Sequence, residues 1–257
     1  MNGRAQLIAL KAILVKEILR FARIWIQTLL PPMITTALYF LIFGRLIGSQ
    51  ISDVHGFQYM EYIVPGLILM AVITNSYANV VSSFYNTKFQ RNIEEMLVSP
   101  LPNYLIMAGF VGGGVARGLA VGAAVTGVAL FYTAIPMHNL WVAISVLLLT
   151  SILFSLAGLI NAIYANSFDH ITIIPTFVLT PLTYLGGVFY TVAMLPPFWQ
   201  NVSLANPILY MVNAFRYGLL GVSDVNLGIA YLAIIGFIAG FFSFALYLLN
   251  RGYGIRS

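Results

Sequence analysis

Long apolar runs set the hydrophobic pattern of this 257-residue chain. Six of these runs are near the roughly 20 residues that a helix needs to cross the hydrocarbon core of a bilayer. They cover residues 25–47, 62–84, 107–134, 140–164, 171–190 and 227–249. The pattern therefore predicts an all-α, polytopic membrane protein with six transmembrane helices.

The segment before the first run has an amphipathic pattern at about 100° per residue. Its apolar residues share one helical face: Leu7, Leu10, Leu14 and Phe21. Its basic residues fall on the opposite face: Lys16, Arg20 and Arg23. This pattern predicts an interfacial helix whose apolar side meets acyl chains and whose basic side meets anionic headgroups of membrane lipids. A charged extension of the first span is the alternative.

Residues 191–226 are too apolar for a solvated loop, yet prolines interrupt them. Pro196-Pro197 and Asn206-Pro207 can each start a helix, which gives two helices of roughly ten to fifteen residues. Helices that short do not cross a bilayer. We therefore expect a re-entrant helical hairpin that dips in from the outside. A seventh and an eighth distorted span are the alternative.

The connection at residues 85–103 predicts a short amphipathic helix that ends before Pro100. Asn86 or Thr87 can cap its start. Its apolar residues form one stripe: Phe89, Ile93, Met96 and Leu97. On the other face, Arg91 and Glu95 can pair at i, i+4. A stiff helix of this kind on the inner face of a membrane bundle suits the docking of a partner protein.

Composition and charge agree with the membrane interpretation and give it an orientation. Hydrophobic residues make up 60% of the chain and charged residues 7%, against about 25% charged in soluble domains. If the N-terminus is inside, the outer loops hold only Arg45 and Arg216. Arg117 falls within a span, and all other basic residues lie on the inner side: Arg4, Lys11, Lys16, Arg20, Arg23, Lys88, Arg91, Arg251 and Arg256. The positive-inside rule favours this topology, with both termini in the cytoplasm. It also explains the net charge of +5 without a nucleic-acid partner.

Catalytic and metal-binding patterns are weak in this sequence. The glycine-rich stretch Gly112–Gly118 lacks the Gly-Lys-Ser/Thr ending of a phosphate-binding loop, so we expect it to pack helices closely. Glu94-Glu95 would need histidine partners to hold a metal, and the three histidines fall in three separate loops: His55, His138 and His170. We therefore predict no catalytic residue, no metal site and no cofactor on this chain. A membrane-embedded hydrolase stays as an alternative, although the clustered catalytic groups that it would need are missing from the sequence.

Arg117 is a charge inside the third span, where insertion costs about 2.5–3.5 kcal/mol. We expect it near the cytoplasmic boundary, paired with Asp169 or with the Glu94-Glu95 region. Simple snorkelling to the interface is the alternative. The other span interiors are nearly free of acids, which argues against an ATP-independent carrier or channel, because such a protein would need polar residues along several spans.

Four motifs, in order along the chain, carry a family resemblance. They are Tyr62–Leu67 (YIVPGL), Asn92–Pro100 (NIEEMLVSP), Leu185–Tyr190 (LGGVFY) with Leu195-Pro196-Pro197, and Asn206–Tyr210 (NPILY) with Phe215-Arg216-Tyr217. With these motifs the chain resembles the permease subunits of ABC-2 type exporters over essentially its whole length. It is most similar to permeases of Gram-negative inner membranes whose substrates are not settled.

The resemblance implies two identical permeases around a central export pathway, with two cytoplasmic ABC ATPase subunits that bind ATP and magnesium. The cargo would be hydrophobic, amphiphilic, or glycan- or lipid-like. It implies a multi-pass protein of the bacterial inner membrane. Many relatives carry Gly-Thr before the glutamate where this chain has Asn92-Ile93. The family's detailed contact between this helix and a groove on the ATPase therefore does not carry over to these residues.

The resemblance also divides the single domain, residues 1–257, into functional segments. Residues 1–23 would be a connecting helix, 24–84 spans one and two, 85–103 the coupling helix, 104–190 spans three to five, 191–226 the extracellular re-entrant segment, and 227–257 span six with a cytoplasmic tail. The residues that would couple to the ATPase are Phe89, Arg91, Asn92, Glu94 and Glu95. Those that mark the re-entrant segment are Pro196, Pro197, Asn206, Pro207 and Arg216.

Overall fold

The computed structural model describes residues 3–48, 53–98 and 100–254, and these residues form helices and connecting turns without a strand. Two residues that the sequence predictions name, Ser99 and Arg256, lie outside the described part. In chain order the elements are α1 (Gly3–Arg23), α2 (Trp25–Tyr39), η1 (Phe40–Ile47), α3 (Tyr59–Phe89), α4 (Asn92–Val98), α5 (Asn103–Leu130), α6 (Leu140–Tyr164), α7 (His170–Ile174), η3 (Pro175–Leu179), α8 (Thr180–Tyr184), η4 (Val192–Met194), α9 (Pro197–Leu204), α10 (Pro207–Leu220) and α11 (Leu227–Arg251).

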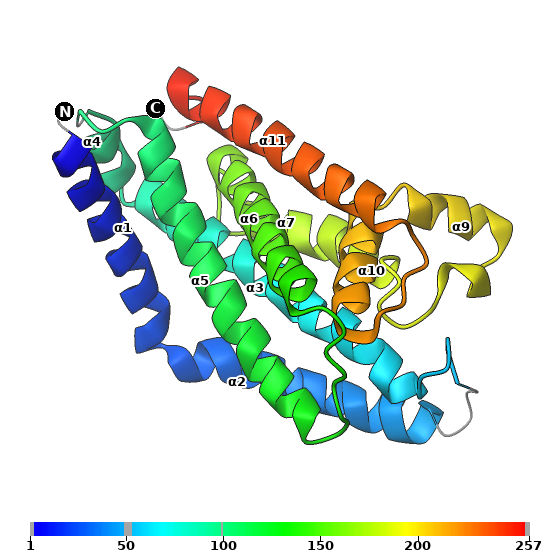
Figure 1. Ribbon diagram of the computed structural model, residues 1–257. Coiled ribbons are helices and arrows are strands. Elements are labelled where there is room, and N and C mark those ends of the chain that lie inside the picture. The colour runs from blue at the N-terminus through cyan, green and yellow to red at the C-terminus, as the bar shows by residue number, and fades with distance from the viewer. Residues whose placement is uncertain (1–2, 49–52, 99, 255–257) are drawn as a thin grey trace.

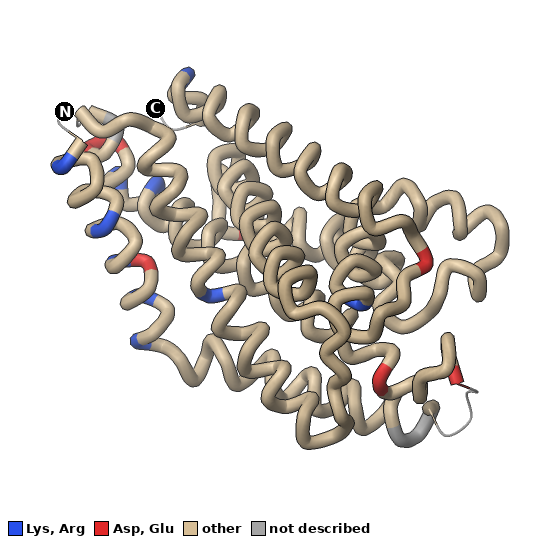
Figure 2. Tube along the Cα trace, in the orientation of Figure 1, with Lys and Arg blue, Asp and Glu red and all other residues tan. Residues whose placement is uncertain are grey.

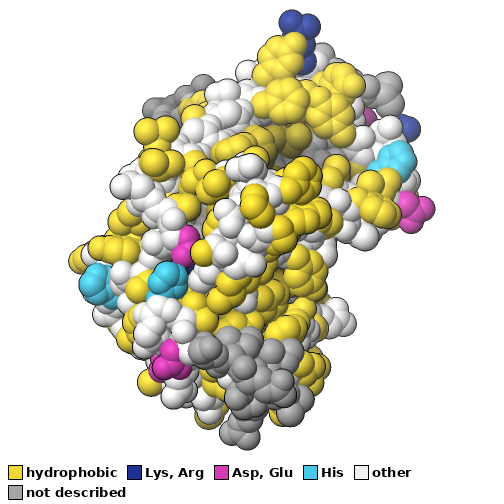
Figure 3. Space-filling view, turned by 90° about the vertical axis from the view of Figure 1, so that its right-hand side faces the viewer, with side chains coloured by type: hydrophobic (Ala, Val, Ile, Leu, Met, Phe, Trp, Pro, Cys, Tyr) yellow, Lys and Arg dark blue, Asp and Glu magenta, His cyan; other side chains and the backbone are white. Residues whose placement is uncertain are grey.

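Five helices have the length and the apolar composition to cross a membrane. They are Trp25–Gly44, Tyr59–Phe89, Asn103–Leu130, Leu140–Tyr164 and Leu227–Arg251, which match five of the six predicted spans. Hydrophobic side chains cover most of the face shown in Figure 3, and charged side chains on it are few. Lipid is the solvent that such a surface fits, and the fold is the expected all-α, polytopic one.

The predicted span at residues 171–190 is shorter in the structure than in the sequence pattern. Its helical part, α7, η3 and α8, consists of three consecutive five-residue pieces, which together rise about 22 Å. The chain then turns at residues 185–190, where Gly187 has a φ of 71°. Glycine adopts that conformation without the cost that a side chain would add. Because this segment falls short of the hydrocarbon thickness, the count of six spans stays a prediction.

Helix α3 is the central element of the bundle. It is the most deeply buried of the five long helices, and α2 and α11 are the least buried. It packs mainly against α5 and α6. Glycines allow the close approach that was predicted for residues 112–118: a Cβ at Gly113 would lie 2.5 Å from Cβ of Glu17 on α1. A Cβ at Gly158 of α6 would lie 2.6 Å from the carbonyl oxygen of Tyr77 on α3.

The two predicted helices between residues 191 and 226 are present. Pro197 and Pro207 occupy the first turns of α9 and α10, and Asn206 caps α10 by accepting a hydrogen bond from the amide of Ile208 (3.0 Å). Asn206 also donates to the carbonyl oxygen of Leu182 (2.6 Å), which fixes α10 against α8. Helix α10 is buried against α3, α6 and α11, whereas much of α9 is exposed. That the two helices re-enter the membrane stays a prediction.

The two ends of the bundle differ in charge. The N-terminus, α4 and the C-terminal end of α11 lie at one end, and α9 lies at the other, together with the segment before α3 (Figure 1). Most Lys and Arg residues lie toward the end with the two termini (Figure 2). The long helices between the ends carry few charges. This sorting is what a bilayer imposes on a chain that crosses it.

The close packing of α3 and α6 makes a testable prediction. Gly158→Ala should lower the free energy of unfolding of the detergent-solubilised protein by about 1–3 kcal/mol. The new methyl group meets main-chain atoms that cannot rotate away. Gly240→Ala is the matched control, since a Cβ there has no atom within 4 Å. Unfolding temperatures measured side by side should drop only for Gly158→Ala. An equal response of the two variants would contradict this packing.

Candidate functional site

The predicted coupling helix is broken in two, so the expectation of one short helix that starts at a cap on Asn86 or Thr87 and ends before Pro100 is wrong. Helix α3 runs on to Phe89, Gln90 and Arg91 form a turn, and α4 begins at Asn92. Thr87 does not cap a helix; its hydroxyl donates to the carbonyl oxygen of Ser83 inside α3 (2.9 Å). The break falls at Arg91 because its φ of 61° is left-handed and interrupts helical hydrogen bonding.

The predicted ion pair between Arg91 and Glu95 is absent from the described residues. Arg91 precedes α4 with a non-helical backbone, so the i, i+4 geometry is lost. Arg91 and Glu95 are exposed, and Glu94 is half-buried. Ile93 is 1% exposed and anchors α4 to the core. The acidic side chains of α4 are thus presented at the surface.

Aromatic rings complete this surface. The ring centroid of Phe168 lies 4.9 Å from that of Tyr85 and 5.3 Å from that of Phe89. Phe89 is 63% exposed and Phe168 is 51% exposed. We call Phe89, Glu94, Glu95 and Phe168 the coupling surface. Phe168 was not among the predicted site residues, although it stands next to Asp169, which was expected to pair with Arg117.

A buried polar network joins α1 to α3 behind this surface. The Glu17 side chain is 0% exposed and accepts hydrogen bonds from Ser83 Oγ (2.7 Å) and Arg20 Nε (3.3 Å). Arg20 Nη2 donates to the side-chain oxygen (2.8 Å) and the carbonyl oxygen (3.0 Å) of Asn79. The assignment of Arg20 to a headgroup-facing side of α1 is therefore wrong. A glutamate three residues before Arg20 in an otherwise basic segment was the signal for this network.

Lys88 ties the end of α3 to α6. Its Nζ donates to the carbonyl oxygens of Ile163 (2.8 Å) and Ala165 (2.7 Å) at the C-terminal end of α6. A cation at this position satisfies carbonyls that have no partner within the helix. Helices α1, α3 and α6 are thus linked by charged side chains next to the coupling surface.

Arg117 does not pair with Asp169 or with Glu94-Glu95, so that expectation is wrong. Its Nη2 donates instead to Oδ1 of Asn75 on α3 (3.1 Å). Arg117 lines a cavity of about 330 Å³ between α2, α3 and α5. Asp169 is exposed at the start of α7, where its carbonyl oxygen accepts from Thr172 Oγ1 (2.8 Å).

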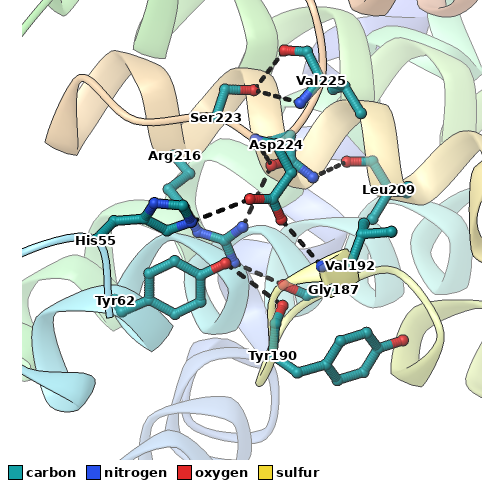
Figure 4. Close-up of polar contacts among 11 residues, drawn as sticks. His55, Tyr62, Gly187, Tyr190, Val192, Leu209, Arg216, Ser223, Asp224 and Val225 are labelled. Atoms are coloured by element: carbon teal, nitrogen blue, oxygen red, sulfur yellow. Dashed lines mark hydrogen bonds and ion pairs between the residues drawn. The ribbon is translucent and has the colours of Figure 1, made fainter. Parts of the chain in front are cut away.

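Arg216 of α10 lies in a polar cluster beside Tyr62, near the start of α3 (Figure 4). Its side chain is 1% exposed and stacks on the ring of Tyr62, with Cζ 3.9 Å from the ring centroid. Its Nη2 donates to the carbonyl oxygen of Gly187 (2.6 Å). Asp224 accepts from the amide of Val192 (3.2 Å) and lies 3.2 Å from His55 Nε2.

This cluster joins the start of α3, the turn at residues 185–190 and α10. Tyr62 and Arg216 both stand in the motifs that carried the family resemblance, but their contact could not be read from separate motifs. Arg216 therefore ties α10 to the turn at residues 185–190 and to α3, and it is buried where the sequence predicted a place in an outer loop.

The α1–α3 network makes a second prediction. Glu17→Ala should lower the free energy of unfolding by about 3–5 kcal/mol, because it leaves Arg20 without the one acidic partner that it has among the described residues. The double variant Glu17→Leu/Arg20→Leu should cost less than Glu17→Ala, since it removes both charges. Lys16→Ala is the control, as that side chain is half exposed and 3.8 Å from Glu17. If thermal unfolding showed that Lys16→Ala loses as much stability as Glu17→Ala, or more, the network would be contradicted.

Comparisons with known proteins agree with this architecture. The family model of the ABC-2 type transporter matches residues 8–220. The chain is 59% identical over 251 residues to the inner membrane transport permease YadH of Escherichia coli (strain K12), covering 97% of this chain and 98% of that protein. It is 26% identical over 226 residues to nodulation protein J of Rhizobium leguminosarum bv. trifolii, with 86% of each chain covered. The chain therefore belongs to the ABC-2 type transporter family, as a multi-pass transport permease of the inner membrane.

Proposed function

We propose that this chain forms half of the transmembrane pathway of an ATP-driven exporter. A separate ABC ATPase binds ATP and magnesium and supplies the energy. The observation that carries this proposal is the coupling surface, which presents two acidic and two aromatic side chains at the end of the bundle where both termini lie. Aromatic side chains are enriched in the core of protein interfaces, and polar side chains form the rim around it.

The end with the two termini faces the cytoplasm in this proposal. Most Lys and Arg residues lie toward that end (Figure 2), and cytoplasmic segments carry the excess of basic residues in membrane proteins. The coupling surface then lies where a soluble ATPase can reach it. The opposite end, with α9 and the Arg216 cluster, faces outward.

Two copies of the chain and two ATPase subunits make up the complex in this proposal. One copy supplies one coupling surface, and a symmetric pair of ATPases needs two. The least buried of the long helices, α2, borders the Arg117 cavity. A second copy packed along α2 would turn that cavity into part of an enclosed pathway.

The cargo is an amphiphile in this proposal. The cavity between α2, α3 and α5 has both apolar and polar walls: it is lined by Pro31, Pro32, Leu67, Met70 and Ala71, and by Thr35, Thr36, Thr74, Asn75 and Arg117. A purely hydrocarbon molecule would leave the positive charge of Arg117 without a counter-charge, and a purely polar one would gain nothing from the apolar walls.

Charge reversal on α4 tests the coupling assignment. Glu94→Lys/Glu95→Lys should weaken association with the ATPase by about tenfold or more, because like charges placed across an interface cost several kcal/mol. The ATPase should no longer co-purify, or the complex should lose its stimulated ATP hydrolysis. The permease itself should insert and unfold as the parent does, since both side chains project from the surface.

Asp53→Lys is the control for this experiment. Asp53 is exposed in the segment before α3, at the other end of the bundle. Asp224 is unsuitable as a control because it bonds to Val192 and contacts His55. If the Glu94/Glu95 double variant assembled and hydrolysed ATP like the parent, the coupling surface would be misassigned, and α1 or the Asp169 turn would become the candidate contact.

A further inference from the structure

We propose that the cavity between α2, α3 and α5 binds the anionic group of an amphiphile, with Arg117 as its counter-charge. This inference rests on the proposed function, because it assigns a cargo chemistry to the pathway that the chain forms. It concerns a phosphate or carboxylate headgroup attached to an apolar tail.

The charge of Arg117 is not compensated within the described structure. Its hydrogen-bond partner is the neutral amide of Asn75, and its Nε is buried without a hydrogen-bond partner. The nearby carboxylate, Glu17, already bonds to Arg20 and Ser83. Arg117 therefore carries a positive charge that no acidic side chain of the described residues pairs with.

Asn75 orients this guanidinium toward the cavity. Its Nδ2 donates to the carbonyl oxygen of Ala71 on the same helix (3.0 Å), which leaves Oδ1 to accept from Arg117. The amide is thus held in one orientation at both ends. Arg117 keeps donors for a second acceptor, because a guanidinium carries five N–H groups in a planar fork that matches carboxylate and phosphate geometry.

The rest of the cavity suits a tail. Pro31, Pro32, Leu67 and Met70 supply apolar walls beside the polar patch. A volume of about 330 Å³ is at the lower end of small-molecule sites, so it can hold a headgroup and the first carbons of a chain but not a whole lipid. The remainder of the tail would extend along the exposed apolar face of α2, whose residues include Leu30, Ile34 and Leu38.

Binding to the purified permease in a neutral detergent tests the proposal without ATPase or ATP. Dodecyl phosphate should bind saturably, and dodecyltrimethylammonium should not. Arg117→Gln should weaken dodecyl phosphate binding by about tenfold or more, since a charge-assisted pair is lost. Arg251→Gln, an exposed charge at the end of α11, should leave it unchanged. Inorganic phosphate should bind far more weakly than dodecyl phosphate; equal binding would overturn the assignment of an amphiphile.

Asn75→Asp keeps the proposal falsifiable if Arg117→Gln fails to fold. A carboxylate at this position would lie within hydrogen-bond reach of Arg117 Nη2 and neutralise it. The carboxylate also loses the hydrogen bond that the Asn75 amide donates to the Ala71 carbonyl oxygen, so the readout is amphiphile binding and not stability. The folded variant should lose dodecyl phosphate binding; unchanged binding would show that Arg117 has a structural role only, and would overturn the proposal.

The outcome separates this inference from the proposed function. Arg117→Gln and Asn75→Asp should still co-purify the ATPase, because the cavity does not include the coupling surface. Loss of amphiphile binding with retained ATPase association supports the inference. Unchanged binding in both variants refutes it and leaves the coupling assignment standing.

Discussion

The cost of placing charge inside a lipid-covered bundle governs this structure. Charge in the hydrocarbon region is tolerated where it reaches an end of the bundle or where protein supplies a partner. Most basic residues take the first solution and gather at the end with the two termini. Arg20 and Arg216 take the second, through Glu17 and Asn79 in one case and through Gly187 and the Tyr62 ring in the other. Arg117 has only a neutral amide, which is why its surroundings are the natural place for an anionic ligand.

The same partners connect the two functional regions. The Glu17 network fixes α1 to α3, and Lys88 fixes the end of α3 to α6. A displacement of α4 by a docked protein would therefore be carried into α3 and α6 together. Helix α3 also forms a wall of the Arg117 cavity and carries Asn75. One rigid helix thus runs from the coupling surface past the cavity to Tyr62, beneath the Arg216 cluster.

Much of this fold follows from sequence periodicity, because apolar length and proline positions act locally. Five spans and the starts of α9 and α10 were predicted on that basis and are confirmed. The break between α3 and α4 could not be predicted, since nothing in the local sequence demands a positive φ at Arg91. The burial of Glu17 and the partner of Arg117 depend on contacts between distant helices, which periodicity does not encode. The short α7–α8 segment was overestimated because apolar residues continue past the turn at Gly187.

In the proposed topology the charged end of the bundle, with the coupling surface and both termini, faces the cytoplasm. The chain contains no cysteine, so single cysteines placed at exposed positions report their side of the membrane. Met194→Cys in η4 should react with a membrane-impermeant maleimide in intact cells, whereas Asn92→Cys in α4 and Tyr253→Cys after α11 should react only once the inner face is opened. Labelling of Asn92→Cys or Tyr253→Cys from outside would show that the charged end faces away from the cytoplasm and would contradict this orientation.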